Sequence, residues 1–242
     1  MNLIIDVGNT FVKLAVFESD ALVFKTAVEL GDVVDEVKNL KHDFPKLKNA
    51  IISSVGALKT SQISAIHKQI DVLQLNHTTK VPFKNSYDTP KTLGIDRIAL
   101  VSASVYHYPK NNVLIIDAGT CITYDFITDK NEYLGGAISP GIRMRYKALH
   151  NLTANLPLLE TKMPKHIIGT STQSSIHSGV INGVINEIDG SIKSYKEKYL
   201  DLTVILTGGD ANFLSEQLKS SIFANSNFLL EGLNYILKFN SN

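Results

Sequence analysis

Two stretches of the chain read almost identically: LIIDVG at residues 3–8 and LIIDAG at residues 114–119. Five of their six positions match, and each stretch continues through a small polar turn into a second β-rich run, FVKLAVF (11–17) or ITYDFI (122–127). The order of strand, aspartate, glycine turn and strand therefore occurs twice. We interpret this recurrence as an internal duplication.

A weaker recurrence supports the duplication. IISSVG (51–56) leads into a predicted helix at about 59–70, and VILTGG (204–209) leads into another at about 211–219. We therefore predict an α/β protein of two similar halves with a cleft between them. The halves would be residues 1–110 and 111–242, divided near a polar break at 108–112. Apolar periodicity predicts further helices at 94–106, 173–199 and 228–238.

The bulk composition excludes several classes of protein. The 242 residues are 44% hydrophobic and 19% charged, and the net charge of +1 argues against a nucleic-acid partner. No apolar run reaches the length needed to span a membrane, and the opening MNLIID has no signal-peptide features. Cys121 is the single cysteine, so no internal disulfide can form and we expect a cytoplasmic protein.

The repeated aspartate turns are suited to phosphate and cations. Gly8 lets the backbone approach a phosphate closely, and Asp6 can hold Mg²⁺ or its water ligands. Lys13 on the returning strand could reach the same phosphates, unless it is an ordinary solvated lysine. Asp117 is the equivalent of Asp6 in the second half. Because two converging aspartates are costly without cations, we expect at least one bound metal ion between the halves.

TGGDA (207–211) follows a buried strand, and its glycines would let a planar base or a ribose lie against bare backbone. An ordinary tight connection between strand and helix is the alternative. The chain lacks GxxxxGK[ST], GxGxxG and the catalytic-loop residues of protein kinases. It is therefore neither a P-loop protein nor a dinucleotide-fingerprint protein, and it is not a protein kinase.

The segment YDTPKTLGIDR (87–97) contains candidates for binding an acceptor molecule. The chain has three arginines against 21 lysines, so Arg97 directly after Asp96 at a predicted helix start is conspicuous. A guanidinium fork suits a carboxylate or phosphate, and Asp96 could act as a base toward a hydroxyl. The alternative is a helix-start aspartate beside a solvated arginine. GGAISPG (135–141), before Arg143, is either a second glycine-rich loop for binding or a structural turn.

Taken in order, these motifs resemble those of the type III pantothenate kinases along nearly the whole chain. The matching segments are DVGNTFVK (6–13), SSVG (53–56), YDTPKTLGIDR (87–97), DAGTCITYD (117–125), GGAISPG (135–141), GTSTQSSIHSG (169–179) and TGGDA (207–211). Cys121 stands where the family often has a small alanine. Each motif alone is weak, but the ordered set is specific.

The resemblance implies an actin-like fold and phosphorylation of pantothenate by ATP, the first step of coenzyme A synthesis. It also implies a homodimer that needs Mg²⁺ and a monovalent cation, K⁺ or NH₄⁺. Asp96 would be the catalytic base, Asp117 would bind the monovalent cation and Asp6 would lie near Mg²⁺. The nucleotide would be bound by Asp6, Val7, Gly8, Asn9, Thr10, Phe11, Val12, Lys13 and Thr120. Pantothenate would be bound by Tyr87, Gly94, Ile95, Asp96, Arg97 and Thr172, with Thr170 as the alternative to Thr172.

Three other readings stay open at the level of sequence. The same fold could phosphorylate another small molecule, such as a sugar or acetate, or cleave polyphosphate. The chain could be a non-catalytic accessory or regulatory homologue, although Asp6, Asp96 and Asp117 are intact and the net charge is small. It could also be a nucleotide-driven module resembling a chaperone, although we find no appended peptide-binding segment.

Overall fold

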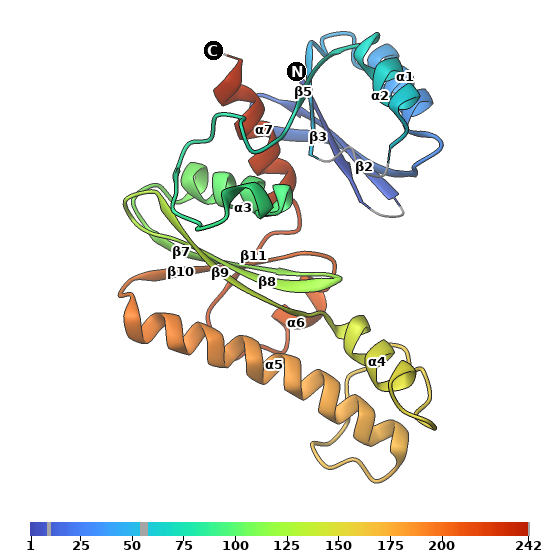
Figure 1. Cartoon of the computed structure of the whole chain (residues 1–242), viewed down its shortest axis with the longest axis vertical. Helices are drawn as coiled ribbons and strands as arrows, with labels where there is room; N and C mark the ends of the chain where they lie inside the picture. The colour runs from blue at the N-terminus through green and yellow to red at the C-terminus, as the bar shows by residue number, and fades with distance from the viewer. Residues whose placement is uncertain (9–10, 54–57, 242) are drawn as a thin grey trace. The chain divides into compact units, whose positions relative to one another are not determined.

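The computed structural model describes residues 1–8, 11–53 and 58–241, which form two compact units (Figure 1). Unit 1 comprises Met1–Pro109 together with Asn227–Asn242, and unit 2 comprises Lys110–Ser226. We expected all residues after 110 to belong to the second half. Residues 227–241 instead pack with the first unit. None of the described helices is both long and apolar enough to cross a membrane.

Unit 1 is a mixed β-sheet with helices on both faces. Its elements are β1 (Asn2–Val7), β2 (Phe11–Glu18), β3 (Ala21–Glu29), α1 (Val33–Asp43), β4 (Asn49–Ile52), α2 (Thr60–His67), β5 (Asp71–Gln74), β6 (Lys84–Asn85), the 3₁₀ turn η1 (Pro90–Thr92), α3 (Ile95–His107) and α7 (Phe228–Asn240). The strand order is β3-β2-β1-β4-β5. β1 runs antiparallel to β2 and parallel to β4.

Alternation along β1 decides which side chains enter the core. Leu3, Ile5 and Val7 point to one face and join α1 and α2 in a hydrophobic cluster. Asn2, Ile4 and Asp6 therefore share the opposite face, on the side of α7: the Asn2 side-chain amide donates to Asn234 of α7 at 2.8 Å. This register brings Asp6 to the end of β1 on the face that α7 covers.

Helix α7 is held in unit 1 by close packing against α3. A Cβ at Gly232 of α7 would lie 2.0 Å from the backbone oxygen of Ala99 in α3, so the two helices approach at a distance that only glycine permits. Asn234, 2% exposed, donates from its side chain to the Ser19 carbonyl at 2.9 Å. Lys238 contacts Asp20 at 2.7 Å. These contacts explain why the segment belongs to unit 1.

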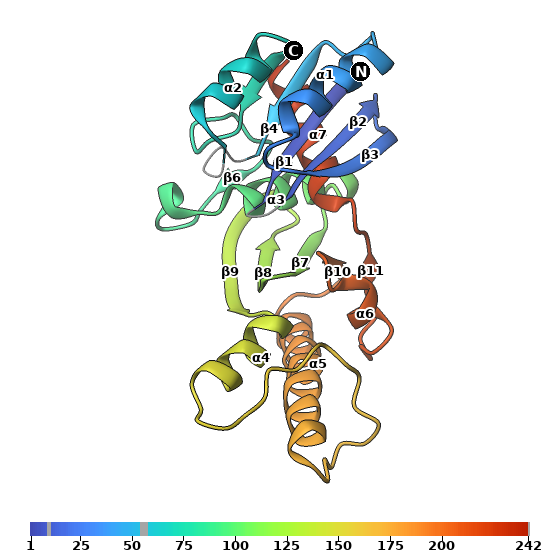
Figure 2. The same cartoon turned by 90° about the vertical axis from the view of Figure 1, so that its right-hand side faces the viewer.

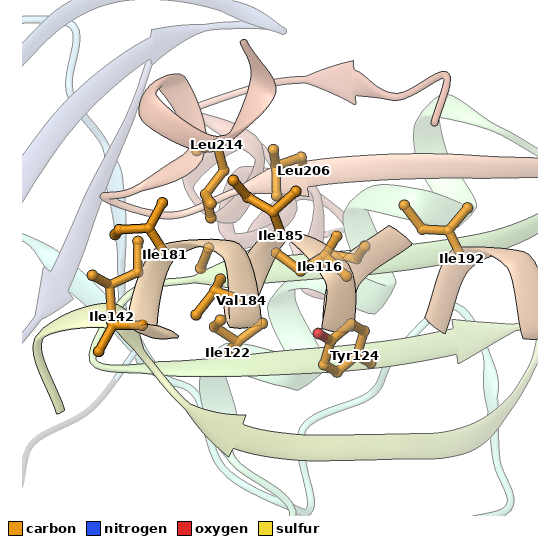
Figure 3. Packing of buried hydrophobic residues seen from close by; sticks show 14 of the residues in the cluster. Ile116, Ile122, Tyr124, Ile142, Ile181, Val184, Ile185, Ile192, Leu206 and Leu214 are labelled. Carbon is orange, nitrogen blue, oxygen red and sulfur yellow. The ribbon is translucent and has the colours of Figure 1, made fainter. Parts of the chain in front are cut away.

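Unit 2 repeats the sheet of unit 1 with different helices. Its elements are β7 (Asn112–Ala118), β8 (Cys121–Ile127), β9 (Glu132–Pro140), α4 (Ile142–Asn151), α5 (Thr172–Lys198), β10 (Leu202–Thr207), α6 (Ala211–Ser215) and β11 (Phe223–Ala224). The long helix α5 lies along one face of the sheet (Figure 2). Ile181, Val184 and Ile185 of α5 pack against β-strand residues such as Ile122 and Leu206 (Figure 3).

The strand order confirms the recurrence predicted from LIIDVG and LIIDAG. In unit 2 the strands run β9-β8-β7-β10-β11, with β7 antiparallel to β8 and parallel to β10, as β1 is to β2 and β4. The predicted helices at 94–106, 173–199 and 228–238 are also present, as α3, α5 and α7. The helix predicted at 211–219 is shorter and ends at Ser215.

Candidate functional site

Asp6 is fixed at the end of β1 by two polar neighbours. The Ser53 hydroxyl donates to Asp6 Oδ1 at 2.9 Å and accepts the Val7 backbone N–H at 3.2 Å. Lys13, opposite Asp6 in the β1–β2 register, places its Nζ 3.9 Å from Asp6 Oδ2. The Asp6 side chain is 14% exposed and that of Lys13 is 59% exposed. The carboxylate is thus held on one side by the Ser53 hydroxyl and faces the exposed Lys13 ammonium on the other.

Burial raises the pKa of Asp6 above its ordinary value, whereas the Ser53 hydrogen bond and the Lys13 charge lower it. The charge of Asp96 raises the pKa of Asp6 further, so the two carboxylates are close enough to repel each other. A cation beside Asp6 would relieve this repulsion. This coupling joins the phosphate-type turn and the GIDR segment within unit 1.

The GIDR residues lie at the start of α3. Asp96 is exposed in the first helical turn, and its Oδ1 accepts the Arg97 backbone N–H at 2.9 Å. A Cβ at Gly94 would lie 2.4 Å from that same oxygen, so a side chain there would displace the carboxylate. Arg97 is 5% exposed, and its guanidinium carbon lies 5.5 Å from the centre of the Tyr87 ring. The Asp96 carboxylate, the Arg97 guanidinium and the Tyr87 ring therefore lie close together at the start of α3.

In unit 2, glycines of two other loops lie against the backbone of the turn that follows β7. Gly208 has φ +96°, and a Cβ there would lie 2.3 Å from the Ala118 oxygen and 2.4 Å from Asp117 Oδ1. A Cβ at Gly141 would lie 2.2 Å from the Gly119 oxygen, and the Gly141 N–H donates to the Thr120 oxygen at 3.1 Å. The loops that follow β7, β9 and β10 thus approach one another at residues 117–120 at distances that only glycine permits.

Thr172 lies elsewhere in unit 2, at the first residue of α5. It lines a groove of about 740 Å³ between α4, α5 and the end of β9. The walls of the groove are mostly apolar and include Pro140, Met144, Ala148, Leu149, Leu156, Ile176 and Val180. Ser171, rather than Thr172, caps α5 by accepting the Ser174 N–H at 3.2 Å. The Thr172 hydroxyl is therefore not needed as the helix cap.

The remaining residues predicted to bind the nucleotide differ in the exposure of their side chains. Val7 and Val12 are buried in the core, so only their backbone groups could contact a phosphate, whereas Phe11 is 53% exposed. Asn9 and Thr10 lie outside the described residues. Sequence reasoning had not assigned Ser53 a role, although it directly follows a buried strand in the SSVG motif.

The donor set fits a cation shared with phosphate better than a cage made by protein alone. Within residues 1–8, 11–53 and 58–241, no group of three or more histidine, cysteine, aspartate or glutamate side chains is placed to hold a metal ion. Mg²⁺ commonly binds one or two carboxylates and completes its coordination with phosphate oxygens and water. Asp6 is the single carboxylate that the first aspartate turn would offer to Mg²⁺. Asp117 offers a carboxylate oxygen at the second aspartate turn.

Comparison with known proteins identifies the family. The family described as type III pantothenate kinase matches residues 2–194. The chain belongs to this family. A type III pantothenate kinase of Christiangramia forsetii is 56% identical over 240 residues, covering 99% of both chains. A type III pantothenate kinase of Flavobacterium johnsoniae is 47% identical over 239 residues, covering 99% of this chain and 98% of its own.

Pantothenate kinase activity with ATP as phosphoryl donor, at the first step of coenzyme A synthesis, is thereby confirmed as the function of the chain. Solved structures agree on the actin-like fold of sugar kinases. A glucokinase from an Antarctic psychrotroph has a TM-score of 0.53 at 11% identity and covers 98% of each chain. A Campylobacter jejuni protein named for the Baf family of transcriptional activators has a TM-score of 0.62 at 22% identity and covers 99% of each.

Proposed function

We propose that the chain transfers the γ-phosphoryl group of ATP to the primary hydroxyl of pantothenate with Asp96 as the general base. The observation that supports this assignment is the position of Asp96, exposed in the first turn of α3 and near enough to Asp6 for its charge to raise the pKa of Asp6. Asp6 belongs to the phosphate-type turn and Asp96 to the acceptor segment. A donor phosphate near one carboxylate and an acceptor hydroxyl near the other would thus be brought within reach of each other.

Asp96 accepts a hydrogen bond from the hydroxyl of pantothenate. The hydroxyl oxygen then forms a bond to the γ-phosphorus, the bond from that phosphorus to the bridging oxygen breaks, and ADP leaves with the electron pair. An alcohol is far less acidic than a carboxylic acid, so Asp96 takes the proton late in the transfer. Its exposure in the first turn of α3 leaves the carboxylate accessible to the substrate.

The nucleotide would be bound by the turn at residues 6–13 and by Thr120, with Lys13 contacting the phosphates. Asp6 would hold Mg²⁺ and Asp117 would hold K⁺ or NH₄⁺. When bound, these cations neutralise negative charge that accumulates on the phosphates during transfer. Asp6 and Asp117 occupy equivalent positions near the ends of β1 and β7, and a different residue lies opposite each one, Lys13 opposite Asp6 and Thr123 opposite Asp117.

Pantothenate would be recognised chiefly through its carboxylate. Arg97 provides a planar fork of donors, and the nearby Tyr87 ring limits the orientations of the guanidinium. Gly94 and Ile95 would line the same site. Thr172 would supply a hydroxyl for the polar groups of pantothenate, a role for which its freedom from helix capping is favourable.

We further propose that the apolar surface of the connection that follows α4 binds a second copy of the chain, giving a homodimer. This connection carries Leu152, Ile167 and Ile168, which are 83%, 76% and 77% exposed. The Ser178 hydroxyl of α5 donates to the Ile167 carbonyl, which holds the backbone at Ile167 beside the helix. Large exposed apolar surfaces are typical of association sites.

The dimer is tested by changing Ile167 and Ile168 to aspartate. We expect the double variant to sediment at the mass of one chain while the wild type sediments at twice that mass. Leu200, 83% exposed beyond the other end of α5, provides the control, since Leu200→Asp should leave the mass unchanged. A wild-type protein of monomer mass would refute the proposal.

The reaction is tested by ADP release from ATP with and without pantothenate, in K⁺ and in Na⁺ buffers. Asp96→Asn should bind ATP normally but lose turnover by roughly a factor of 10² or more. Asp35→Asn is the matched control, because Asp35 is also an exposed acid in the first turn of a helix, α1. Turnover of Asp96→Asn close to that of Asp35→Asn would remove Asp96 from the mechanism.

The reaction consumes ATP, and the single cysteine is compatible with a reducing compartment, so we place the protein in the cytoplasm. The same ADP assay separates the alternatives. A regulatory homologue would release no ADP, a module resembling a chaperone would release ADP without need of pantothenate, and a sugar kinase would respond to a sugar instead.

A further inference from the structure

The loops around the second aspartate turn contain an ion pair that the roles assigned above do not use. Arg143 in the first turn of α4 donates from its guanidinium to Asp210 Oδ1 at 2.8 Å. The Asp210 side chain is 6% exposed, whereas that of Arg143 is 63% exposed. A buried acid therefore holds one end of a guanidinium whose remainder faces solvent.

This ion pair flanks the turn that follows β7. The Asp210 backbone N–H donates to the Ala118 oxygen at 2.9 Å, and the Gly141 N–H, two residues before Arg143, donates to the Thr120 oxygen at 3.1 Å. The pair thus joins the loops after β9 and β10 on either side of residues 118–120. Arg143 therefore lies beside the loops that surround Asp117.

The turn after β7 carries two carboxylates, which a positively charged side chain held in place would stabilise. Asp117 Oδ1 lies next to Gly208, and Asp210 follows two residues later, so two carboxylates lie at the turn to which we assign the monovalent cation and Thr120 of the nucleotide site. Within the described part of the chain, Asp210 Oδ1 is paired with Arg143, and Asp210 Oδ2 is buried without a hydrogen bond. An arginine with one edge anchored loses little conformational freedom when its other donors bind a phosphate.

We propose that Arg143 binds the phosphate chain of the nucleotide and that Asp210 is a positioning residue that orients it. The ligand class is a nucleoside di- or triphosphate, recognised through charge-assisted hydrogen bonds from the exposed edge of the guanidinium. The inference rests on the proposed nucleotide site but adds a residue from a motif outside residues 6–13 and Thr120. The opposing explanation is that the pair only fastens two loops together.

The test uses the full-length protein and three nucleotide-site probes: ATP in turnover, and ADP and adenosine in binding titrations. Arg143→Met should raise the KM for ATP and the Kd for ADP about tenfold, with the KM for pantothenate and the affinity for adenosine unchanged. Arg143→Lys should fall between, because a point charge replaces the fork. Asp210→Asn keeps the arginine and should raise both values about threefold.

Lys147→Met is the matched control, since Lys147 lies one turn further along α4 and is also an exposed cation. It should change none of these values. Normal ADP binding by Arg143→Met, with or without a lower Tm, would overturn the proposal and leave a structural ion pair. A parallel loss of adenosine affinity would overturn the assignment to phosphate. If the wild type shows no turnover with pantothenate, the proposed reaction fails, while the ADP comparison still decides the role of Arg143.

Discussion

Replacing Ser53 with alanine tests how Asp6 is held. Ser53 is 3% exposed, and its hydroxyl bonds both Asp6 Oδ1 and the Val7 N–H, at 2.9 and 3.2 Å. The variant loses both bonds. A buried donor left unsatisfied costs about 1–3 kcal/mol, and a hydrogen bond to a charged group contributes about 1.5–3 kcal/mol. Since the groups can partly adjust, we expect Ser53→Ala to lower the free energy of unfolding by about 3 kcal/mol, or Tm by about 6–12 °C.

Ser102→Ala is the control for this experiment. Ser102 is fully buried in α3, and its hydroxyl donates to the Ile98 carbonyl of the same helix at 2.8 Å. Removing this hydroxyl leaves no backbone N–H without a partner, so Ser102→Ala should lower the free energy of unfolding by about 1 kcal/mol or less. The assay is urea or thermal unfolding of the wild type and both variants under identical conditions.

The dependence on pH separates the Asp6 contact from simple packing. Because the pKa of Asp6 is raised in the folded state, chiefly by burial, its contribution to stability is fully present below the unfolded-state pKa and is lost as pH rises through the folded-state pKa. The Ser53 bond lowers this pKa, so its loss should destabilise the protein more at pH 7 than at pH 4. Equal destabilisation by Ser53→Ala and Ser102→Ala, at either pH, would refute this account of Asp6.

Three further predictions concern the two aspartate turns and the acceptor segment. Gly208→Ala should lower stability by about 3 kcal/mol or more, since φ is +96° and the new Cβ would overlap the Asp117 turn; thermal unfolding measures this. Arg97→Lys should mainly raise the KM for pantothenate, because a point charge replaces a fork, and an unchanged KM contradicts the carboxylate assignment. Lys13→Met removes a charge that lowers the pKa of Asp6, so the acidic limb of kcat/KM for ATP should move to higher pH; an unmoved limb would separate Asp6 from ATP binding.

The sequence was sufficient to predict the repeated part of the fold. The matching of LIIDVG with LIIDAG predicted two strand–turn–strand units, and alternation along FVKLAVF placed Lys13 on a different face from Val12 and Leu14. Both inferences depend on the two-residue period of a strand, which is visible in the sequence itself. The position of Arg97 at a helix start could be predicted from the helical period of the apolar residues at 94–106.

The contacts made between distant segments could not be predicted in this way. Ser53 meets Asp6 because β4 lies parallel to β1, a pairing of residues nearly fifty positions apart. Arg143 meets Asp210 because two separate loops converge on the same turn. The assignment of 227–241 to unit 1 depends on the fit of Gly232 against α3, which no local pattern indicates. These features are set by the order of strands in the sheet.

The placement of α7 has a consequence for the order in which the protein is built. Unit 2 is encoded without interruption, so all of its strands are available once residue 226 has left the ribosome. Unit 1 must wait with one face of its sheet uncovered until α7 emerges, after the whole of unit 2. The unit that begins synthesis first is therefore completed last, and release of a chain before residue 227 would leave the half that carries Asp6 and Asp96 with an exposed apolar face.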